Sequence, residues 1–218
     1  MSPLAVIDCS TPVPSSEAAA DLDLLAAFLE DRALPDFGRA AAAALINAFG
    51  GLAGVAAADA AALARAGVPS GTVADLVRAR ALALVMVRVE ACRRPVLSSW
   101  KALTAYLRAD LAHAPREQFR TLYLDKRNIL MRDEHRADGT IDHAPVYVRE
   151  VVRRALELSA SAMILVHNHP SGDPTPSRAD IDMTRRIVDA ARVFDIQVHD
   201  HVIVGREGTK SFRALGLI

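Results

Sequence analysis

The sequence has little of what marks secreted, membrane-spanning or strongly nucleic-acid-binding proteins. Its 218 residues include only two cysteines, Cys9 and Cys92, which excludes a disulfide framework and a cysteine-rich zinc site. Apolar runs such as ALALVMV at 81–87 are too short to span a bilayer, and the first residues lack the pattern of a signal peptide. We therefore predict a cytoplasmic protein that does not associate with membranes.

The chain also lacks an excess of charge of either sign. Residues 1–95 hold 8 Lys/Arg and 10 Asp/Glu, and residues 96–218 hold 18 and 16. Neither half therefore has the strongly basic balance typical of a nucleic-acid-binding domain. What the chain does contain is apolar residues, 51% of the total, and seven histidines, all after residue 95. The histidines indicate metal or acid–base chemistry in the second half.

The first half is predicted to be helical. Residues 1–20 carry three prolines and several serines and are predicted to form a mobile tail. Apolar residues then recur at spacings of three and four as far as residue 91, with glycine-rich breaks that divide the segment into four or five short helices. Pro95 ends the last helix. These signals predict a helical domain at 21–95 and a second domain at 96–218.

The second half changes its periodicity after Pro115 and is predicted to be a mixed α/β domain. Two alternating stretches predict a hairpin, and the continuous apolar run SAMILV predicts a strand buried on both faces. Helical patterns occur between and after these stretches. The predicted elements are a helix at 100–110, strands at 119–125 and 128–137, a helix at 145–158, a strand at 161–166, a helix at 177–193 and a strand at 196–205.

His167 and His169 follow the apolar run and are two residues apart. On a strand, such side chains point to the same face, with Cα atoms roughly 6–7 Å apart. Asp180 lies at the start of the next predicted helix, and the Pro/Gly loop before it can fold that helix over the strand end. Two histidines and one carboxylate, with a fourth position left for water, form the layout of a hydrolytic zinc site.

Each of these residues also has a simpler interpretation. A His-x-His pair alone is weak evidence for a metal. Ser177 and Asp180 have the spacing of a helix capping box. The letters HNH at 167–169 are no evidence for an HNH nuclease, which spreads its residues over a ββα unit. A two-metal nuclease would also need several clustered carboxylates, and the sequence does not show them.

The combined spacing is more specific than its parts. His167-x-His169, seven residues, Ser177, two residues and Asp180 match the HxH-x7-S-x2-D motif of the JAMM (MPN+) metalloproteases. The surrounding HNHPSGDPTPS resembles the RadC branch of that group, as do VLSSW, GTID, REVVRRALEL and DHVIVG. The resemblance covers residues 96–218 firmly and residues 21–95 loosely. It implies a JAMM/MPN domain with a cytidine-deaminase-like fold, after a small helix-hairpin-helix-like domain.

The resemblance also implies roles for individual residues. His167, His169 and Asp180 are expected to hold Zn²⁺, and Ser177 to donate to the oxyanion of a peptide or isopeptide substrate. JAMM proteins carry an upstream glutamate that acts as general base. Counting back from the Gly-Thr at 139–140, Glu134 occupies that place; the alternative is an exposed hairpin carboxylate.

Two other histidines lie close together in VHDHV. We predict a structural hydrogen bond near the site for His201, and a position at the surface or behind the ligands for His199.

The helical domain is predicted to bind DNA poorly. A helix-hairpin-helix contacts the DNA backbone through amides of a Gly-x-Gly hairpin. Here Gly67 fits the first glycine, but Pro69 stands at the second and has no N–H to donate. No lysine follows, and the domain is slightly acidic, which disfavours phosphate contacts. We expect it to pack within the protein or to bind another protein.

These observations predict a zinc-dependent hydrolase of the JAMM type acting on a protein or peptide. The alternative is a DNA-associated accessory or repair-linked protein whose metal site is structural or vestigial. The base at Glu134 separates the two hypotheses, because a structural site needs none.

Overall fold

A computed structural model describes residues 15–30, 38–92, 95–138 and 146–218. The chain divides into two compact units, residues 1–82 and 83–218. The division falls within the helix Ser70–Cys92 (α5), and the domain limits placed at residue 95 stay a prediction. Most of the predicted tail at 1–20 lies outside the described residues, and the first helix begins at Ser15.

The first unit is helical, as predicted. Its core is made of leucines and small aliphatic residues, among them Leu25, Leu29 and Leu63. The turn between the last two helices contains Gly67, whose positive φ of 86° is a conformation that glycine adopts without strain. That the turn is a helix-hairpin-helix stays a prediction. The helices are α1 (Ser15–Glu30), α2 (Gly38–Phe49), α3 (Leu52–Ala57), α4 (Ala60–Arg65) and the start of α5.

The second unit is built on a five-stranded mixed sheet with the order β2-β1-β3-β4-β5. The first two strands form the predicted antiparallel hairpin, and β1 also pairs antiparallel with β3. β3 and β4 are parallel, and the connection between them contains a helix, because parallel neighbours need a long crossover. The strands are β1 (Gln118–Leu124), β2 (Leu130–Asp138), β3 (Ala162–Asn168), β4 (Gln197–Gly205) and β5 (Gly208–Ser211).

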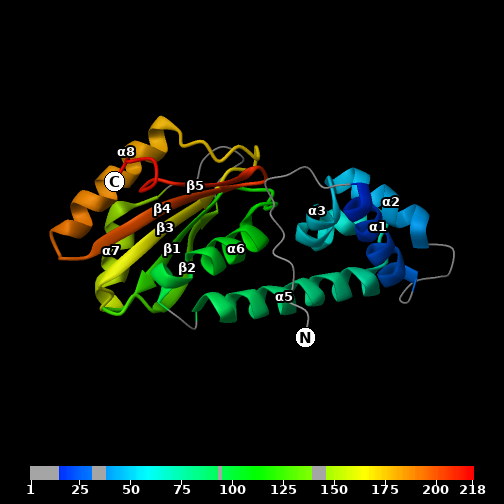
Figure 1. Ribbon diagram of the computed structural model, residues 1–218, viewed down its shortest axis with the longest axis horizontal. Coiled ribbons are helices and arrows are strands. Elements are labelled where there is room, and N and C mark those ends of the chain that lie inside the picture. Colours follow the sequence, from blue (N-terminus) through cyan, green and yellow to red (C-terminus); the bar gives the residue numbers. More distant parts are fainter. Residues whose placement is uncertain (1–14, 31–37, 93–94, 139–145) are drawn as a thin grey trace. The chain divides into compact units, whose positions relative to one another are not determined.

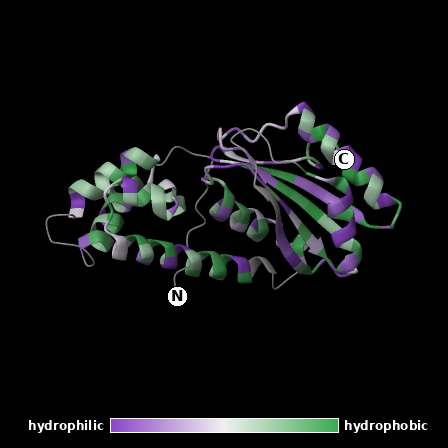
Figure 2. Cartoon of the chain, turned by 180° about the vertical axis from the view of Figure 1, so that it is seen from behind, coloured by the Kyte–Doolittle hydropathy of each residue, from purple (hydrophilic) through white to green (hydrophobic). Residues whose placement is uncertain are grey.

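Helices cover both faces of this sheet (Figure 1). On one face, α6 (Trp100–Leu111) packs through Leu103 and Leu107 against β1, β3 and β4. On the other, α7 (Val148–Glu157) and α8 (Arg178–Arg192) pack against Phe119, Met163 and Leu165. Every residue of β3 is buried, which explains its continuous apolar run. Figure 2 shows hydrophobic residues along the middle strands of the sheet. Along the helices, hydrophobic and hydrophilic residues alternate.

The predicted α/β class is confirmed: a helical region is followed by a mixed sheet domain. The cytidine-deaminase-like detail stays a prediction. Among the described strands, β5 was not predicted, because its four residues, GTKS, are too few to show an alternation. Part of the helix predicted at 145–158 lies outside the described residues, and α7 begins at Val148. Among the described helices, none combines the length and the apolar character that a membrane span requires.

Candidate metal centre

Two histidines converge at the C-terminal end of β3. His167 belongs to the strand and is buried. The backbone N–H of His169 donates to the carbonyl oxygen of Val204 at 2.9 Å, which extends the β3–β4 pairing beyond the strand. The alternation of a strand therefore continues to His169, and both rings point to one side of the sheet. Their Nε2 atoms are 2.9 Å apart.

The loop after His169 brings Asp180 to the same point. Gly172 has a positive φ of 102°, and its carbonyl oxygen would lie 2.0 Å from a Cβ placed on Gly205. The loop therefore packs directly on the backbone of β4 at Gly205, which has no side chain. α8 begins after Ser177, and the Asp180 carboxylate faces the histidines. Its Oδ1 is 3.3 Å from Nε2 of His167, and its Oδ2 is 3.6 Å from Nε2 of His169.

The three side chains fit a metal such as zinc. Their ligand atoms all lie within 4.8 Å of one another, and imidazole nitrogen with carboxylate oxygen is a donor set that zinc accepts. Around a tetrahedral zinc with bonds of about 2.0–2.1 Å, neighbouring ligand atoms are about 3.3 Å apart. The separations of 2.9, 3.3 and 3.6 Å lie around that value. His167, His169 and Asp180 can therefore bind a metal.

The protonation of the three residues also suits a cation. Burial lowers the pKa of His167 to about 4, so the ring is neutral near pH 7. Burial alone would raise the pKa of Asp180. Hydrogen bonding with His169, the positive charge that His167 gains in acid and hydrogen bonding with Ser177 nevertheless hold that pKa well below its usual range. Asp180 also raises the pKa of His169, mainly through that hydrogen bond. A bound cation would displace any proton from His169 and meet an ionised carboxylate.

The capping box is present as well, and it involves the same aspartate. Ser177 Oγ accepts from the N–H of Asp180 at 3.2 Å, and the N–H of Ser177 donates to Asp180 Oδ2 at 2.7 Å. Both interpretations of this pair therefore hold together. Oδ2 caps the helix, and Oδ1 remains directed at His167. Ser177 itself is exposed.

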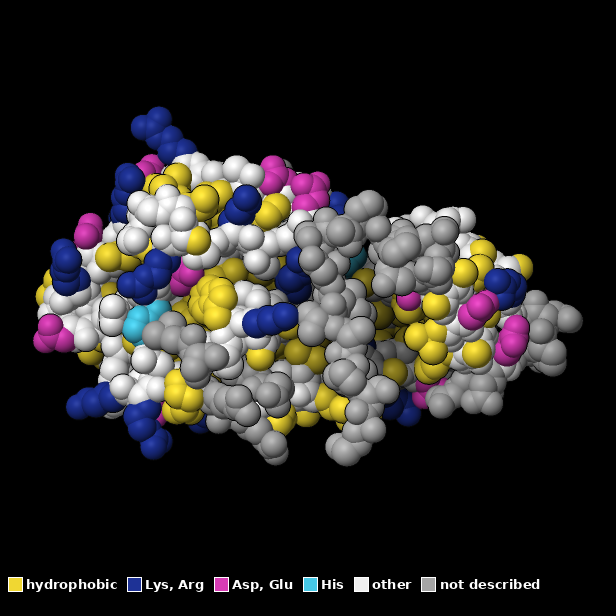
Figure 3. All heavy atoms as spheres, viewed as in Figure 1, with side chains coloured by type: hydrophobic (Ala, Val, Ile, Leu, Met, Phe, Trp, Pro, Cys, Tyr) yellow, Lys and Arg dark blue, Asp and Glu magenta, His cyan; other side chains and the backbone are white. Residues whose placement is uncertain are grey.

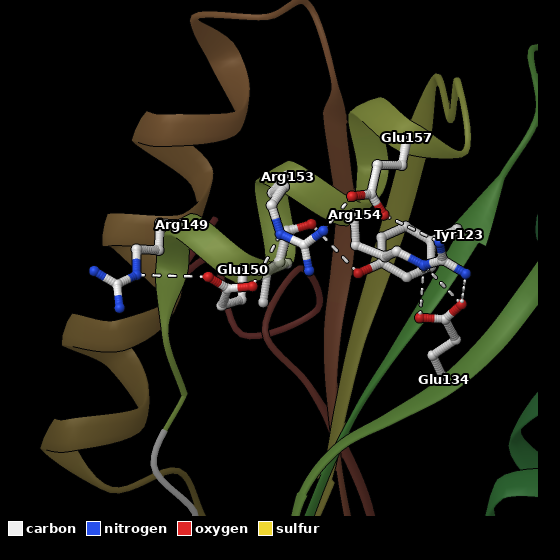
Figure 4. A network of polar contacts seen from close by, with 8 residues as sticks. Tyr123, Glu134, Arg149, Glu150, Arg153, Arg154 and Glu157 are labelled. Carbon is white, nitrogen blue, oxygen red and sulfur yellow. Dashed lines mark hydrogen bonds and ion pairs between the residues drawn. The ribbon is translucent and has the colours of Figure 1, made fainter.

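Glu134 is not among the three converging residues. It lies on β2 opposite Thr121, which is itself opposite Leu165, so β1 separates it from β3. Its carboxylate accepts from Arg154 of α7 at 2.6 and 2.9 Å. Figure 4 shows this pair at the end of an ion-pair network along α7. The catalytic role predicted for Glu134 stays a prediction.

A second carboxylate, Glu117, lies nearer to the ligands. Phe119 is opposite His167 in the β1–β3 pairing, so Glu117 lies at the level of His169. Its negative charge is one of the causes that raise the pKa of His169. The sequence reasoning missed Glu117 because it did not place the strand at 119–125 beside the strand at 161–166. With that pairing known, the position of Glu117 could have been inferred.

The VHDHV histidines have different environments. His201 is fully buried and contacts His167, with 2.8 Å between Nε2 of His201 and Nδ1 of His167. His199 is also buried, which differs from a surface position, and its Nε2 is 2.6 Å from Oδ1 of Asn128. It lines a separate hollow of about 300 Å³ with Trp100 and Arg213. Only His201 is therefore connected to the candidate ligands.

Comparison with known proteins agrees with this geometry. Residues 97–217 match the family model described as the RadC-like JAB domain, a range that includes every candidate site residue named above. A UPF0758 protein of Rhodobacter capsulatus is 50% identical over 205 residues, which are 93% of this chain and 95% of that protein. Because its second half matches this family model and nearly its whole length resembles a UPF0758 protein, the chain belongs to the RadC family.

Proposed function

We propose that this protein is a zinc-dependent hydrolase of the JAMM type that cleaves a peptide or isopeptide amide. The observation that carries the proposal is the convergence of two imidazole nitrogens and one carboxylate at the end of β3. Three protein ligands are typical of catalytic zinc sites, which keep one position open, whereas structural sites are closed by four. The match to a JAB domain supports the same reaction class.

The roles of the side chains follow from their surroundings. Zinc held here would supply Lewis-acid chemistry, which polarises a carbonyl and lowers the pKa of water to about 7. His167 and His169 present nitrogen lone pairs, and Asp180 contributes the negative charge. The Oγ of Ser177 accepts from the N–H of Asp180, so its own proton stays available for donation to an oxyanion. An exposed position lets this hydroxyl reach a substrate.

Two carboxylates are candidates for the general base, and we favour Glu117 over Glu134. A base must lie within hydrogen-bonding reach of the proton that it takes. Glu117 lies at the level of His169 and acts electrostatically on it. Glu134 lies on the edge strand, with its carboxylate held by two nitrogens of Arg154. Glu134 could act only after that ion pair opens.

The first test is the metal itself. We expect about one zinc per chain by elemental analysis of tag-free protein, and loss of that zinc in His169→Ala. Amide hydrolysis is then followed with quenched fluorescent peptides and isopeptide-linked peptides. Glu117→Gln and Glu134→Gln form a matched pair, and both are expected to keep zinc. We expect Glu117→Gln to lower kcat by about 10²–10⁴-fold, the usual contribution of a general base.

The outcomes separate the hypotheses. A greater loss in Glu134→Gln would restore the original assignment of the base. Folded protein that binds no zinc at micromolar concentrations of the metal would refute the hydrolase. Zinc binding without hydrolysis of either substrate class would favour the alternative of an accessory protein with a structural site.

A further inference from the structure

We propose that His201 and Thr184 are positioning residues that hold His167 in the tautomer required for metal binding. The proposal rests on the metal site proposed above and goes beyond it to residues that do not touch the metal. Thr184 lies on α8 and His201 on β4, both are fully buried, and neither belongs to the ligand motif.

The two residues form an unbroken chain of hydrogen bonds behind His167. Nδ1 of His167 is 2.8 Å from Nε2 of His201. Nδ1 of His201 is 2.6 Å from Oγ1 of Thr184. The Thr184 hydroxyl is 2.6 Å from the backbone carbonyl oxygen of Asp180, one turn earlier on the same helix. The chain therefore begins at one candidate ligand and ends at the backbone of another.

The carbonyl oxygen at the end sets the direction of every bond. A carbonyl can only accept, so the Thr184 hydroxyl gives its single proton to Asp180 O. Nδ1 of His201 must then donate to Thr184 Oγ1, which leaves Nε2 of His201 as an acceptor. His167 in turn must donate from Nδ1. Its Nε2 is left with a free lone pair, directed at His169 and Asp180.

A carbonyl oxygen also determines the tautomer of the second candidate ligand, His169, without intervening residues. Nδ1 of His169 is 2.8 Å from the carbonyl oxygen of Asp173, so Nδ1 carries a proton. In the neutral ring, Nε2 is therefore the nitrogen that offers a lone pair to a metal. Nδ1 of His169 contacts a carbonyl oxygen directly, whereas the partner described for Nδ1 of His167 is the ring of His201. Through His201 and Thr184, the backbone carbonyl of Asp180 on α8 determines which nitrogen of His167 carries the proton.

Packing holds the hydrogen-bonded relay Asp180 O–Thr184–His201–His167 in one arrangement. The ring of His201 lies against Phe212 and Phe119, with centroid distances of 4.5 and 6.0 Å. Its backbone N–H donates to Oδ1 of Asp200 at 2.7 Å. A ring enclosed in this way cannot exchange its partners for water. The relay therefore prepares the ligand before metal arrives, as partners behind metal-bound histidines commonly do.

Thr184→Val and Thr184→Ser make a matched pair of variants. Valine has nearly the shape of threonine but no hydroxyl, and serine keeps the hydroxyl. Zinc affinity is measured by competition with a chromophoric chelator, and ¹⁵N chemical shifts of the metal-free protein report the His167 tautomer. We expect Thr184→Val to weaken zinc binding by about 10–100-fold and to reduce the population of the Nδ1–H tautomer. Thr184→Ser should resemble the wild type in both measurements.

The outcomes distinguish this proposal from the proposed function. If folded Thr184→Val keeps wild-type zinc affinity and the wild-type tautomer, the relay is refuted while the metal site stands. If wild-type protein binds no zinc, the metal site and the relay are refuted together. Should Thr184→Val fail to fold, His201→Phe carries the same test, because its aromatic ring can occupy the space between Phe212 and Phe119.

Discussion

At the scale of single residues, two buried imidazoles lie at the candidate metal centre. His167 and His201 are both fully buried in the second unit, and burial lowers the pKa of each. A neutral imidazole is the form that binds a metal, so the same burial prepares the site and excludes protons from it. The unfolded chain has no such constraint and takes up protons at the ordinary pKa.

We therefore predict that the metal-free protein loses stability as the pH falls below about 6.5. The pKa of His167 is about 4 in the folded state and 6.5 in the unfolded state. The contribution of the neutral His167 ring to stability is fully present above pH 6.5. It is lost progressively as the pH falls toward 4, because the unfolded chain binds a proton that the folded chain does not. Between pH 7 and 5, the loss from His167 alone is about 2 kcal/mol of unfolding free energy. His201 shifts in the same direction.

Urea denaturation in the presence of a chelator measures this change. Trp100 is the only tryptophan and lies in the second unit, so its fluorescence follows the unit that contains the site. His167→Gln, which cannot titrate, is the control and should have a smaller dependence on pH. Equal unfolding free energies at pH 7 and pH 5 in the wild type would contradict the prediction.

At the scale of elements, the start of α8 joins helix capping to the candidate site. The Ser177–Asp180 capping box satisfies backbone N–H groups that the helix cannot pair internally. The same box orients the Asp180 carboxylate, because Ser177 N–H holds Oδ2 and leaves Oδ1 directed at His167. Local stability and ligand position therefore depend on the same two residues.

Ser177→Ala is expected to lower the unfolding free energy by about 1 kcal/mol, the usual cost of losing an N-cap side chain. Ser177→Thr keeps a capping hydroxyl and should lose less. Both are measured by urea denaturation of the metal-free protein, so that zinc binding does not contribute. A Ser177→Ala variant as stable as the wild type would show that this cap adds nothing to stability.

At the scale of the whole molecule, charge argues against DNA as the principal partner. The chain carries equal numbers of basic and acidic residues. On the face drawn in Figure 3, Lys and Arg side chains are dispersed and do not gather into one basic patch. Duplex DNA attracts proteins mainly through phosphate contacts with clustered basic residues.

We predict that the full chain binds duplex DNA with a dissociation constant above about 100 µM, which is weaker than usual non-specific binding. Fluorescence anisotropy at 50 and 200 mM salt provides the test. Pro69→Gly restores one amide donor in the turn after α4, but no charge, so it should not bring binding into the micromolar range. Micromolar affinity with a steep dependence on salt would instead support the accessory-protein alternative.

The sequence by itself determined most of the described elements and the choice of three candidate ligands. The apolar run before His167 predicts a buried strand, and the spacing to Ser177 and Asp180 places a helix start after the loop. These are local patterns, and local patterns depend on few neighbours. The structure agrees with them in β3 and α8.

Only the tertiary structure decided which distant residues support the ligands. Glu117 approaches His169 because β1 pairs with β3, and His201 meets His167 because β4 lies on the other side of β3. Arg154 reaches Glu134 from a different helix. Strand order and helix packing bring these pairs together, and they follow from burial of the whole apolar surface. No spacing along the chain encodes such contacts.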